Sequence, residues 1–323
     1  MTRRRITQFL VAGACGSSAC ASKGQPETLA KVRGMAERES LAIIGWWRSA
    51  DDGRYLVPTA FTVTGASAGR LLLPDRPYWL SVAANACSVA WVPFSTVSSP
   101  LFPGGAAEPL VRFAEDRRAV RTVRFTGVCA NQVAISSKAE HIAVIAVIDN
   151  AGSRRLIVLN AASAEVEYDL TDLITRFTLS AVYRLQISAN GDRLAVASRE
   201  SFVVIDLPSR KLVLDGVDRF PSLSPRGDTL AFVHKSGSLV VTALATGTKR
   251  ILMNRWWATA VGIGAWSPDG KFLLAGVRDP IGLFTSLVAI DAETDESAEI
   301  MRLEVEGDHG EACTWIKRHF LSA

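Results

Sequence analysis

A short segment that recurs without a gap constrains the fold of this chain more than any other feature. Three copies occupy residues 188–196, 224–232 and 267–275, and each begins with Ser, places Gly three positions later and continues into an apolar run. Glycine accepts the positive φ angle that a tight turn requires, and the flanking apolar runs have the length of short strands. Each copy therefore predicts two antiparallel strands joined by a tight turn.

The spacing of these segments defines a repeating unit. Degenerate copies occur at residues 136–144, where Ala139 takes the glycine position, and around Gly53. The stretches between turns alternate or run apolar as strands do, without the 3.6-residue period of helices. Four strands in about 45 residues match the size of one propeller blade. The apolar or Trp position before each turn recurs at Trp47, Trp91, Ile135, Ile187, Leu223, Trp266 and Trp315.

The turns and strands also carry a resemblance to a known family. It rests on Ser-Pro-Arg-Gly (224–227), Ser-Pro-Asp-Gly (267–270) and the strands FVVIDLPS (202–209) and LVAIDAET (287–294). These motifs resemble the WD40-like or TolB-like β-propeller repeat, well over residues 130–323 and poorly over 41–130. The resemblance implies an all-β propeller of four-stranded antiparallel blades and leaves the ligand open. TolB itself is not expected, because it carries an α/β domain before its propeller and only about forty residues precede the first repeat here.

The strand count predicts how the ring closes. Six complete units, each running from an inner strand A to an outer strand D, are followed by a fragment at residues 312–323 with strands A and B only. An outer strand from residues 24–40 would complete a seventh blade by overlap of the N- and C-terminal strands. Seven blades are therefore predicted, and six are the alternative if the last fragment pairs with the first unit. The longest interval contains Leu170, Leu173, Ile174 and Phe177 at helical spacing, which predicts a short helix.

The N-terminal residues resemble an export signal. Residues 1–22 combine a basic start, a short apolar stretch and small residues, as a signal peptide or lipoprotein leader does. Cys15 lies in an imperfect lipobox and is the predicted site of a lipid anchor, and Arg3-Arg4-Arg5 has twin-arginine character. Residues 23–40 then form an N-terminal segment, considered as a closing strand, and 41–323 the propeller domain. The predicted location is the periplasm or cell envelope, and a cytoplasmic protein with a frayed basic terminus is the alternative.

Charge and hydropathy exclude two classes of partner. The formal net charge of +4 comes entirely from residues 1–40, and the rest of the chain has as many basic as acidic residues. Without a basic stripe, nucleic-acid binding is not expected. The longest apolar run, Ile142–Ile148, is the length of a buried strand and far below that of a transmembrane span. Cys87, Cys129 and Cys313 are interpreted as buried thiols, with a Cys87–Cys129 disulfide as the alternative.

Most conspicuous side chains have a structural interpretation. The Trp residues before the turns are expected to pack between neighbouring blades, because large aromatic side chains are mostly buried. The aspartates that follow or lie within the turns are interpreted as turn residues. They are Asp192, Asp228 and Asp269.

The candidate binding residues lie in two D-to-A loops, which should meet on one face around the mouth of the central channel. Arg255, Trp256 and Trp257 form one group, and an Arg beside exposed aromatic residues is a common anchor for a partner. The alternative is that both Trp side chains pack between blades. The second group is Asp308, His309 and Glu311, which suits a metal or acid–base chemistry only if further ligands converge from other blades.

These observations favour a non-catalytic binding module of the cell envelope. Its predicted partner is a protein, peptide or glycan at the channel mouth formed by D-to-A loops, and no cofactor or metal is predicted. Neither a nucleophile elbow, a P-loop nor a dinucleotide fingerprint is found in the sequence. The alternative is a propeller-type hydrolase, lyase or lactonase that acts on a small molecule over the channel.

Overall fold

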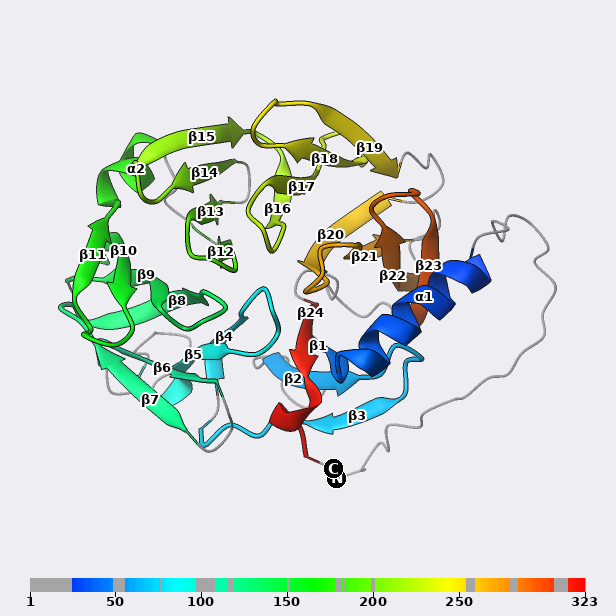
Figure 1. The fold of residues 1–323 in the computed structure, drawn as a ribbon. Coiled ribbons are helices and arrows are strands. Elements are labelled where there is room, and N and C mark those ends of the chain that lie inside the picture. Colours follow the sequence, from blue (N-terminus) through cyan, green and yellow to red (C-terminus); the bar gives the residue numbers. More distant parts are fainter. Residues whose placement is uncertain are drawn as a thin grey trace, which may run out of the picture.

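The chain folds into a ring of six four-stranded antiparallel sheets around a central axis (Figure 1). The computed structural model describes residues 25–48, 56–75, 77–96, 108–115, 119–149, 152–177, 182, 184–198, 201–253, 259–278, 284–304 and 313–322. This arrangement confirms the all-β propeller and the four-stranded blades predicted from the repeats.

The blades follow one another along the chain, and the strands of each blade lie side by side from the innermost to the outermost. Blade 1 is β24 (Thr314–Lys317), β1 (Leu41–Arg48), β2 (Leu56–Phe61) and β3 (Ser67–Arg70). Blade 2 is β4 (Pro77–Val82), β5 (Val89–Pro93), β6 (Leu110–Ala114) and β7 (Val120–Arg124). Blade 3 is β8 (Cys129–Ile135), β9 (His141–Val147), β10 (Arg154–Asn160) and β11 (Val166–Asp169).

The remaining elements complete the ring. Blade 4 is β12 (Arg184–Ile187), β13 (Arg193–Ala197), β14 (Phe202–Asp206) and β15 (Lys211–Gly216). Blade 5 is β16 (Arg219–Leu223), β17 (Thr229–Val233), β18 (Leu239–Ala243) and β19 (Lys249–Met253). Blade 6 is β20 (Thr259–Trp266), β21 (Phe272–Arg278), β22 (Phe284–Asp291) and β23 (Ser297–Glu304). The helices are α1 (Gln25–Arg38), α2 (Thr171–Arg176) and the 3₁₀ turns η1 (Phe94–Thr96) and η2 (Arg318–Phe320).

The prediction of seven blades is wrong, and the six-blade alternative is correct. The C-terminal strand β24 pairs with β1 in register, Leu41 opposite Lys317 and Ile44 opposite Thr314, and so supplies the innermost strand of blade 1. Trp47 and Trp91 lie on β1 and β5, the second strands of their blades, not on innermost strands. The described chain from β1 to β7 thus contains one strand fewer than two complete blades, and the C-terminal fragment fills that place. Closure by overlap of the terminal strands is confirmed.

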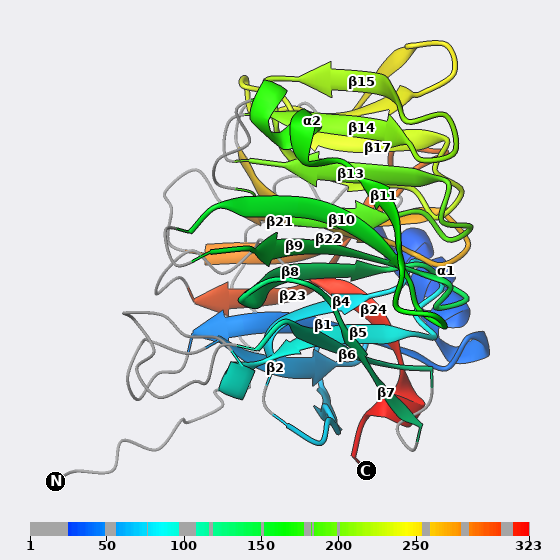
Figure 2. The same cartoon turned by 90° about the vertical axis from the view of Figure 1, so that its left-hand side faces the viewer.

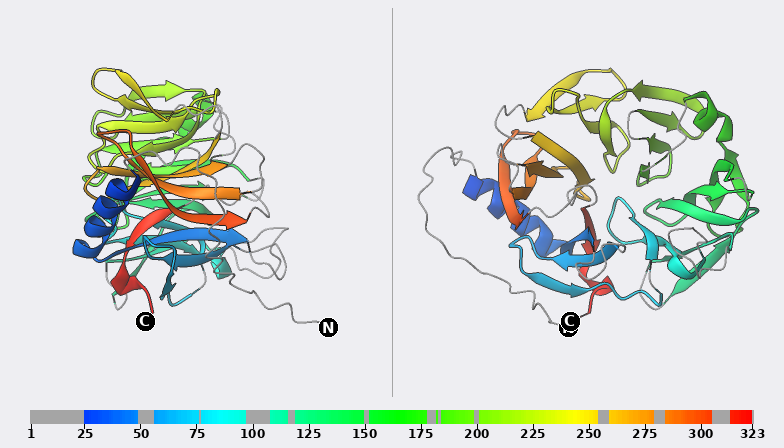
Figure 3. Two further views of the ribbon diagram at one scale, coloured as in Figure 1. Left: turned by 90° about the vertical axis from the view of Figure 1, so that its right-hand side faces the viewer. Right: turned by 180° about the vertical axis from the view of Figure 1, so that it is seen from behind.

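The N-terminal segment forms a helix and not a closing strand. Within α1, Leu29, Val32 and Ala36 lie three and four residues apart, so they share one helix face. Val32 and Met35 are buried against blades 6 and 1, and the Thr28 hydroxyl donates a hydrogen bond to the Glu296 carboxylate at 2.9 Å. The helix contacts β22, β23 and β1 (Figures 1 and 3). It therefore packs across the seam where the ring closes.

The Ser-x-x-Gly turns have the geometry that the repeats predict. Gly191, Gly227 and Gly270 have φ angles of +81°, +72° and +75°, and Ala139 takes the same left-handed conformation at +51°. The serine hydroxyl of each turn accepts a hydrogen bond from the backbone N–H five residues later. These pairs are Arg193 N to Ser188 Oγ at 3.0 Å, Thr229 N to Ser224 Oγ at 3.1 Å, Phe272 N to Ser267 Oγ at 2.9 Å and His141 N to Ser136 Oγ at 3.0 Å.

The same turns join neighbouring blades. The backbone N–H of Ser137 donates to the Ala189 carbonyl at 3.0 Å, and the N–H of Ala189 donates to the Pro225 carbonyl at 2.8 Å. A Cβ on Gly191 would lie 2.3 Å from Cδ2 of His141, in the preceding blade. Glycine is therefore needed at position 191 for two reasons, the left-handed backbone and the close approach of the next blade.

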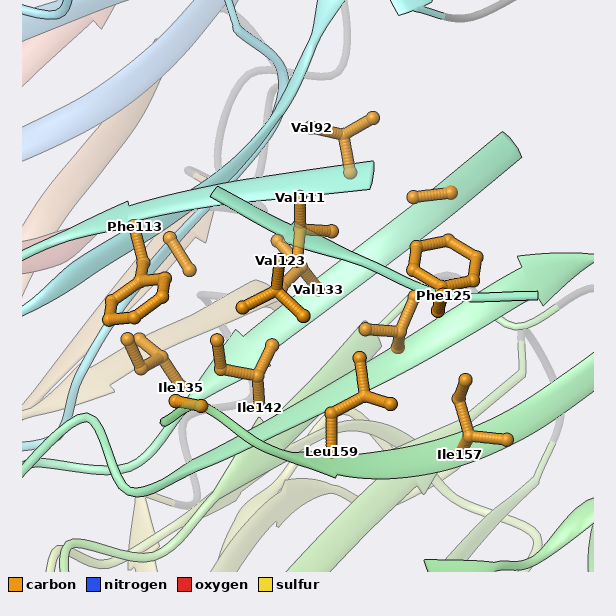
Figure 4. Packing of buried hydrophobic residues seen from close by; sticks show 14 of the residues in the cluster. Val92, Val111, Phe113, Val123, Phe125, Val133, Ile135, Ile142, Ile157 and Leu159 are labelled. Carbon is orange, nitrogen blue, oxygen red and sulfur yellow. The ribbon is translucent and has the colours of Figure 1, made fainter. Parts of the chain in front are cut away.

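The core is divided among the contacts between blades. Six buried clusters fill the six blade-to-blade interfaces, and α1 adds its apolar face to the one between blades 6 and 1. Figure 4 shows the cluster between blades 2 and 3, in which Phe113 and Val123 face Ile135 and Leu159. The expected packing of Trp91, Trp266 and Trp315 between blades is confirmed, since these side chains are at most 5 % exposed. The side chain of Trp47 is outside the described set.

The strands place their connections on two opposite faces (Figure 2). We call the face with the A-to-B and C-to-D turns the turn face, and the face with the B-to-C and D-to-A connections the connection face. Asp192, Asp228 and Asp269 lie on the turn face, where each accepts a side-chain hydrogen bond within its own turn, so their structural interpretation is confirmed. Helix α2 confirms the short helix expected after Leu170.

Two glycine substitutions separate the two functions of the turn glycine. Gly247 has a φ of +70° but open space around its Cα, whereas Gly191 has a φ of +81° and faces His141. We expect Gly247→Ala to lower the free energy of unfolding by about 1 kcal/mol, from backbone strain alone. Gly191→Ala should lower it by about 2–3 kcal/mol, because His141 must also give up its hydrogen bond to Glu167. Denaturant unfolding measures both, and equal losses would contradict the contact between blades.

Candidate functional site

The candidate binding residues of the sequence fall outside the described residues. Arg255, Trp256 and Trp257 belong to the connection between β19 and β20, and Asp308, His309 and Glu311 to that between β23 and β24. Both connections join an outermost strand to the next innermost strand, as expected. Whether the two groups come together stays a prediction. The described part of the same face carries further candidate residues.

The connection from β15 to β16 exposes an apolar side chain on the connection face. It consists of only two residues, Val217 and Asp218, so it cannot fold back over its own blade. Val217 is 63 % exposed, more than any other large hydrophobic residue that the structure describes. The next residue after this connection, Arg219, is also exposed. An exposed aliphatic side chain beside an exposed guanidinium is an arrangement suited to contact with a partner.

The backbone beside this connection is strained. Phe220 has a φ of +54°, a left-handed conformation that is unfavourable for a bulky residue, and it is followed by Pro221. The pairing of β16 with β17 shifts register between Arg219 and Ser222. A bulge of this kind turns the strand end and redirects its side chains. Strain that persists in a folded protein is concentrated at functional sites, which supports this strand end as part of one.

Hydrogen bonds hold the innermost strands of blades 4, 5 and 6 together beneath this connection. The Arg184 guanidinium of β12 donates through Nη2 to the Gly264 carbonyl of β20 at 2.9 Å, past the intervening blade 5. The Ser222 hydroxyl of β16 donates to the same carbonyl at 2.8 Å, and Trp266 Nε1 donates to the Ser222 carbonyl at 3.0 Å. The three strands therefore form a rigid base for Val217 and Arg219.

A second group on the same face lies between blades 2 and 3. Burial raises the pKa of the Tyr78 hydroxyl, the nearby Cys129 thiol raises it further, and the Arg154 guanidinium lowers it in part. Burial also raises the pKa of Cys129. Both effects favour the neutral forms of the Tyr78 hydroxyl and the Cys129 thiol.

The titratable residues that the structure describes are dispersed. Across the described ranges, no three His, Cys, Asp or Glu side chains lie close enough together to hold a metal ion. His141 lies on the turn face and pairs through Nδ1 with Glu167 at 2.7 Å, whereas Nδ1 of His234 lies 2.9 Å from Ser236 Oγ. Cys87, Cys129 and Cys313 are free thiols. Within the residues that the structure describes, no helix is long and apolar enough to cross a membrane.

Sequence reasoning missed Val217, Arg219 and Phe220. The interval from Ile187 to Leu223 is the shortest of the repeat, which could have indicated a connection too short to shelter an apolar residue. Nothing in the residue types indicates the left-handed conformation of Phe220.

The comparisons with known proteins agree with the architecture. No protein-family model matches the chain, and no curated protein matches it. Among solved structures, TolB from Acinetobacter baumannii superposes with a TM-score of 0.56 at 15% identity, over 92% of this chain and 73% of that one. A weaker match is the Cps50 (Swd1) β-propeller domain of Myceliophteria thermophila, with 16% identity and a TM-score of 0.41 over 57% of this chain and 59% of that one. Another is hydrazine synthase of Kuenenia stuttgartiensis, with 16% identity and a TM-score of 0.44 over 74% of this chain and 68% of that one.

These findings define the class of protein as a β-propeller with a TolB-like, WD40-like architecture. The resemblance inferred from the Ser-Pro-x-Gly turns is thereby confirmed at the level of the fold. At 15% identity the likeness to TolB extends to the fold alone.

Thiol labelling tests the packing of the three described cysteines. Burial raises the pKa of Cys313 to about 12, so at about pH 8 only about one thiol in 10⁴ is ionised and able to react. In a Cys15→Ser, Cys20→Ser variant, iodoacetamide should modify the half-buried Cys87 first, Cys129 more slowly and Cys313 only after unfolding. Peptide mass spectrometry gives the three rates, and rapid modification of native Cys313 would contradict the structure.

Proposed function

We propose that this protein is a non-catalytic interaction module that binds a protein, peptide or glycan on the connection face of its propeller. The observation that carries the proposal is the group formed by exposed Val217, exposed Arg219 and left-handed Phe220 at the start of β16. A few anchors on a rigid frame account for most of the affinity in protein recognition. The sheets and the bonds among β12, β16 and β20 supply that frame.

The loop residues predicted from the sequence extend the same binding face. Residues 254–258 connect blades 5 and 6, and β16 and β20 are linked through Ser222 and Gly264. Trp256 and Trp257 thus belong to the connection that follows blade 5, whereas Val217 lies in the connection that precedes blade 5 and Arg219 at the start of its first strand. We propose that Arg255, Trp256 and Trp257 add aromatic and cationic anchors to this group, and that Asp308, His309 and Glu311 contribute polar contacts on the far side of blade 6.

A pair of matched variants tests the binding face. Val217→Ser with Arg219→Ser removes an apolar and a cationic side chain from the connection face. The control, Val166→Ser with Arg226→Ser, removes the same two types from an outer strand and from the turn face, where both are also exposed. We expect the first variant to lose captured partners from a native envelope extract by roughly tenfold or more, and the control to retain them. Equal capture by two variants with unchanged thermal unfolding would refute this location.

We further propose that the protein is exported to the periplasm or cell envelope, with Cys15 as the site of a lipid anchor. The support is the order of charge and hydropathy in residues 1–22. Full-length protein should fractionate with the envelope, whereas a form without residues 2–22 should stay in the cytosol. Cys15→Ser should remain exported but lose membrane attachment. A cytosolic full-length protein would exclude export.

A further inference from the structure

Blade 2 carries a pocket that is separate from the connection-face group. It has a volume of about 640 Å³, within the range of small-molecule sites. Its lining is mainly polar and consists of Ser95, Thr96, Glu108, Leu110, Arg112, Thr122, Arg124 and Ala164.

The pocket uses one face of the two outer strands of blade 2. Arg112 of β6 lies directly opposite Thr122 of β7, and Leu110 lies opposite Arg124, so the four side chains share a face of the sheet. Val111, Phe113 and Val123 alternate with them and pack into blade 3. The four residues on β6 and β7 therefore lie on the side of the sheet that faces blade 1, where Trp91 packs against Ile44 and Ile316.

One lining residue comes from the neighbouring blade 3. Ala164 lies in the turn between β10 and β11, whereas the other seven lining residues belong to blade 2.

The Arg112 guanidinium is fixed in position at this pocket. Its Nη1 donates to the Asp75 carboxylate at 2.8 Å, and the other oxygen of Asp75 accepts from Trp91 Nε1 at 2.8 Å. The Arg112 side chain remains about one third exposed, although its Nε is buried without a hydrogen-bond partner among the described groups. Asp75 therefore fixes the orientation of a partly exposed guanidinium.

The second guanidinium of the pocket is only loosely held. Arg124 is two thirds exposed and its Nη1 lies 3.4 Å from the Glu108 carboxylate. An exposed ion pair at this distance contributes little stability, so exchanging Glu108 for a ligand carboxylate costs little. Arg112 and Arg124 are on adjacent strands and on the same face, two residue pairs apart, which suits two cations that contact one planar anionic group.

We propose that this pocket binds a small organic carboxylate, whose oxygens accept from Arg112 and Arg124 while Ser95 and Thr122 contact its polar substituents. Guanidinium groups match carboxylates in a planar, bidentate geometry that ammonium groups cannot reproduce. The pocket holds a molecule of the size of an acidic monosaccharide or an acidic amino-acid derivative. The ligand class is defined by the carboxylate, and the experiment separates these two sources.

Titrations with four probes test the proposal on the protein that lacks residues 1–22. N-acetyl-L-glutamate and D-galacturonate carry the carboxylate, and N-acetyl-L-glutaminamide and D-galactose are their neutral counterparts. Ligand-observed NMR should detect at least one carboxylate with a Kd near 1 mM or tighter, and neither neutral probe up to about 20 mM. Which carboxylate binds tighter identifies the source. No binding of either carboxylate in that range, or equal binding of the neutral probes, overturns the proposal.

Variants on one strand show whether the pocket is responsible. Arg124→Gln should weaken carboxylate binding roughly tenfold, and Arg112→Lys, which keeps the charge beside Asp75 but loses the planar group, should do the same. Arg121→Gln is the matched control, because Arg121 lies on β7 as well but points to the opposite face, where it covers the Phe113 ring and donates to the Ala161 carbonyl. Equal weakening in Arg121→Gln would mean general charge attraction and would refute the site.

Discussion

The antiparallel pairing of β24 with β1 is the interaction on which the rest of this molecule depends. A sheet edge exposes a row of unpaired N–H and C=O groups, and a ring of blades that does not close leaves both terminal blades with an uncovered apolar face. Here the last strand of the chain pairs with Leu41–Ile44 and completes blade 1 from the inside. Helix α1 then covers the same seam from outside the sheets, with Val32 and Met35 in the cluster shared by blades 6 and 1. The two ends of the chain therefore secure one interface together.

Turn chemistry fixes the geometry once the ring is closed. A serine hydroxyl caps the A-to-B turns of blades 3 to 6, and the left-handed residue that follows allows the next blade to approach. His141 shows how tight this is, since its ring occupies the space that a side chain at position 191 would need. Because each buried cluster lies between two neighbouring blades, most of the stability comes from six similar interfaces.

The repeats predicted the fold because each copy contains both the turn and the strands that it joins. Ala139, which the repeat places at the glycine position, has the left-handed conformation of the other turns, and the helix after Leu170 was predicted from helical spacing. The number of blades was not predicted, because the first and second strands of a blade are both rich in apolar residues. Trp47 on a second strand therefore looks the same in sequence as Trp266 on a first strand. Helix α1 was missed because the expected overlap of terminal strands outweighed the helical spacing of Leu29, Val32 and Ala36.

The candidate sites were harder to predict for a related reason. The repeat predicts only the residue types that the blades have in common, whereas the candidate binding residues differ from blade to blade. No sequence pattern predicts the left-handed backbone conformation of Phe220. The exposure of Val217 follows from a connection of only two residues. The pocket on blade 2 is lined mainly by η1, β6 and β7, which contain none of the repeated Ser-x-x-Gly turns. The Ser and Gly of the turns are explained by closure of the ring, since they recur from blade to blade. Closure of the ring does not require Arg112, which Asp75 holds in place in blade 2. Binding of a ligand that needs a fixed guanidinium would explain why this arginine is oriented by a carboxylate.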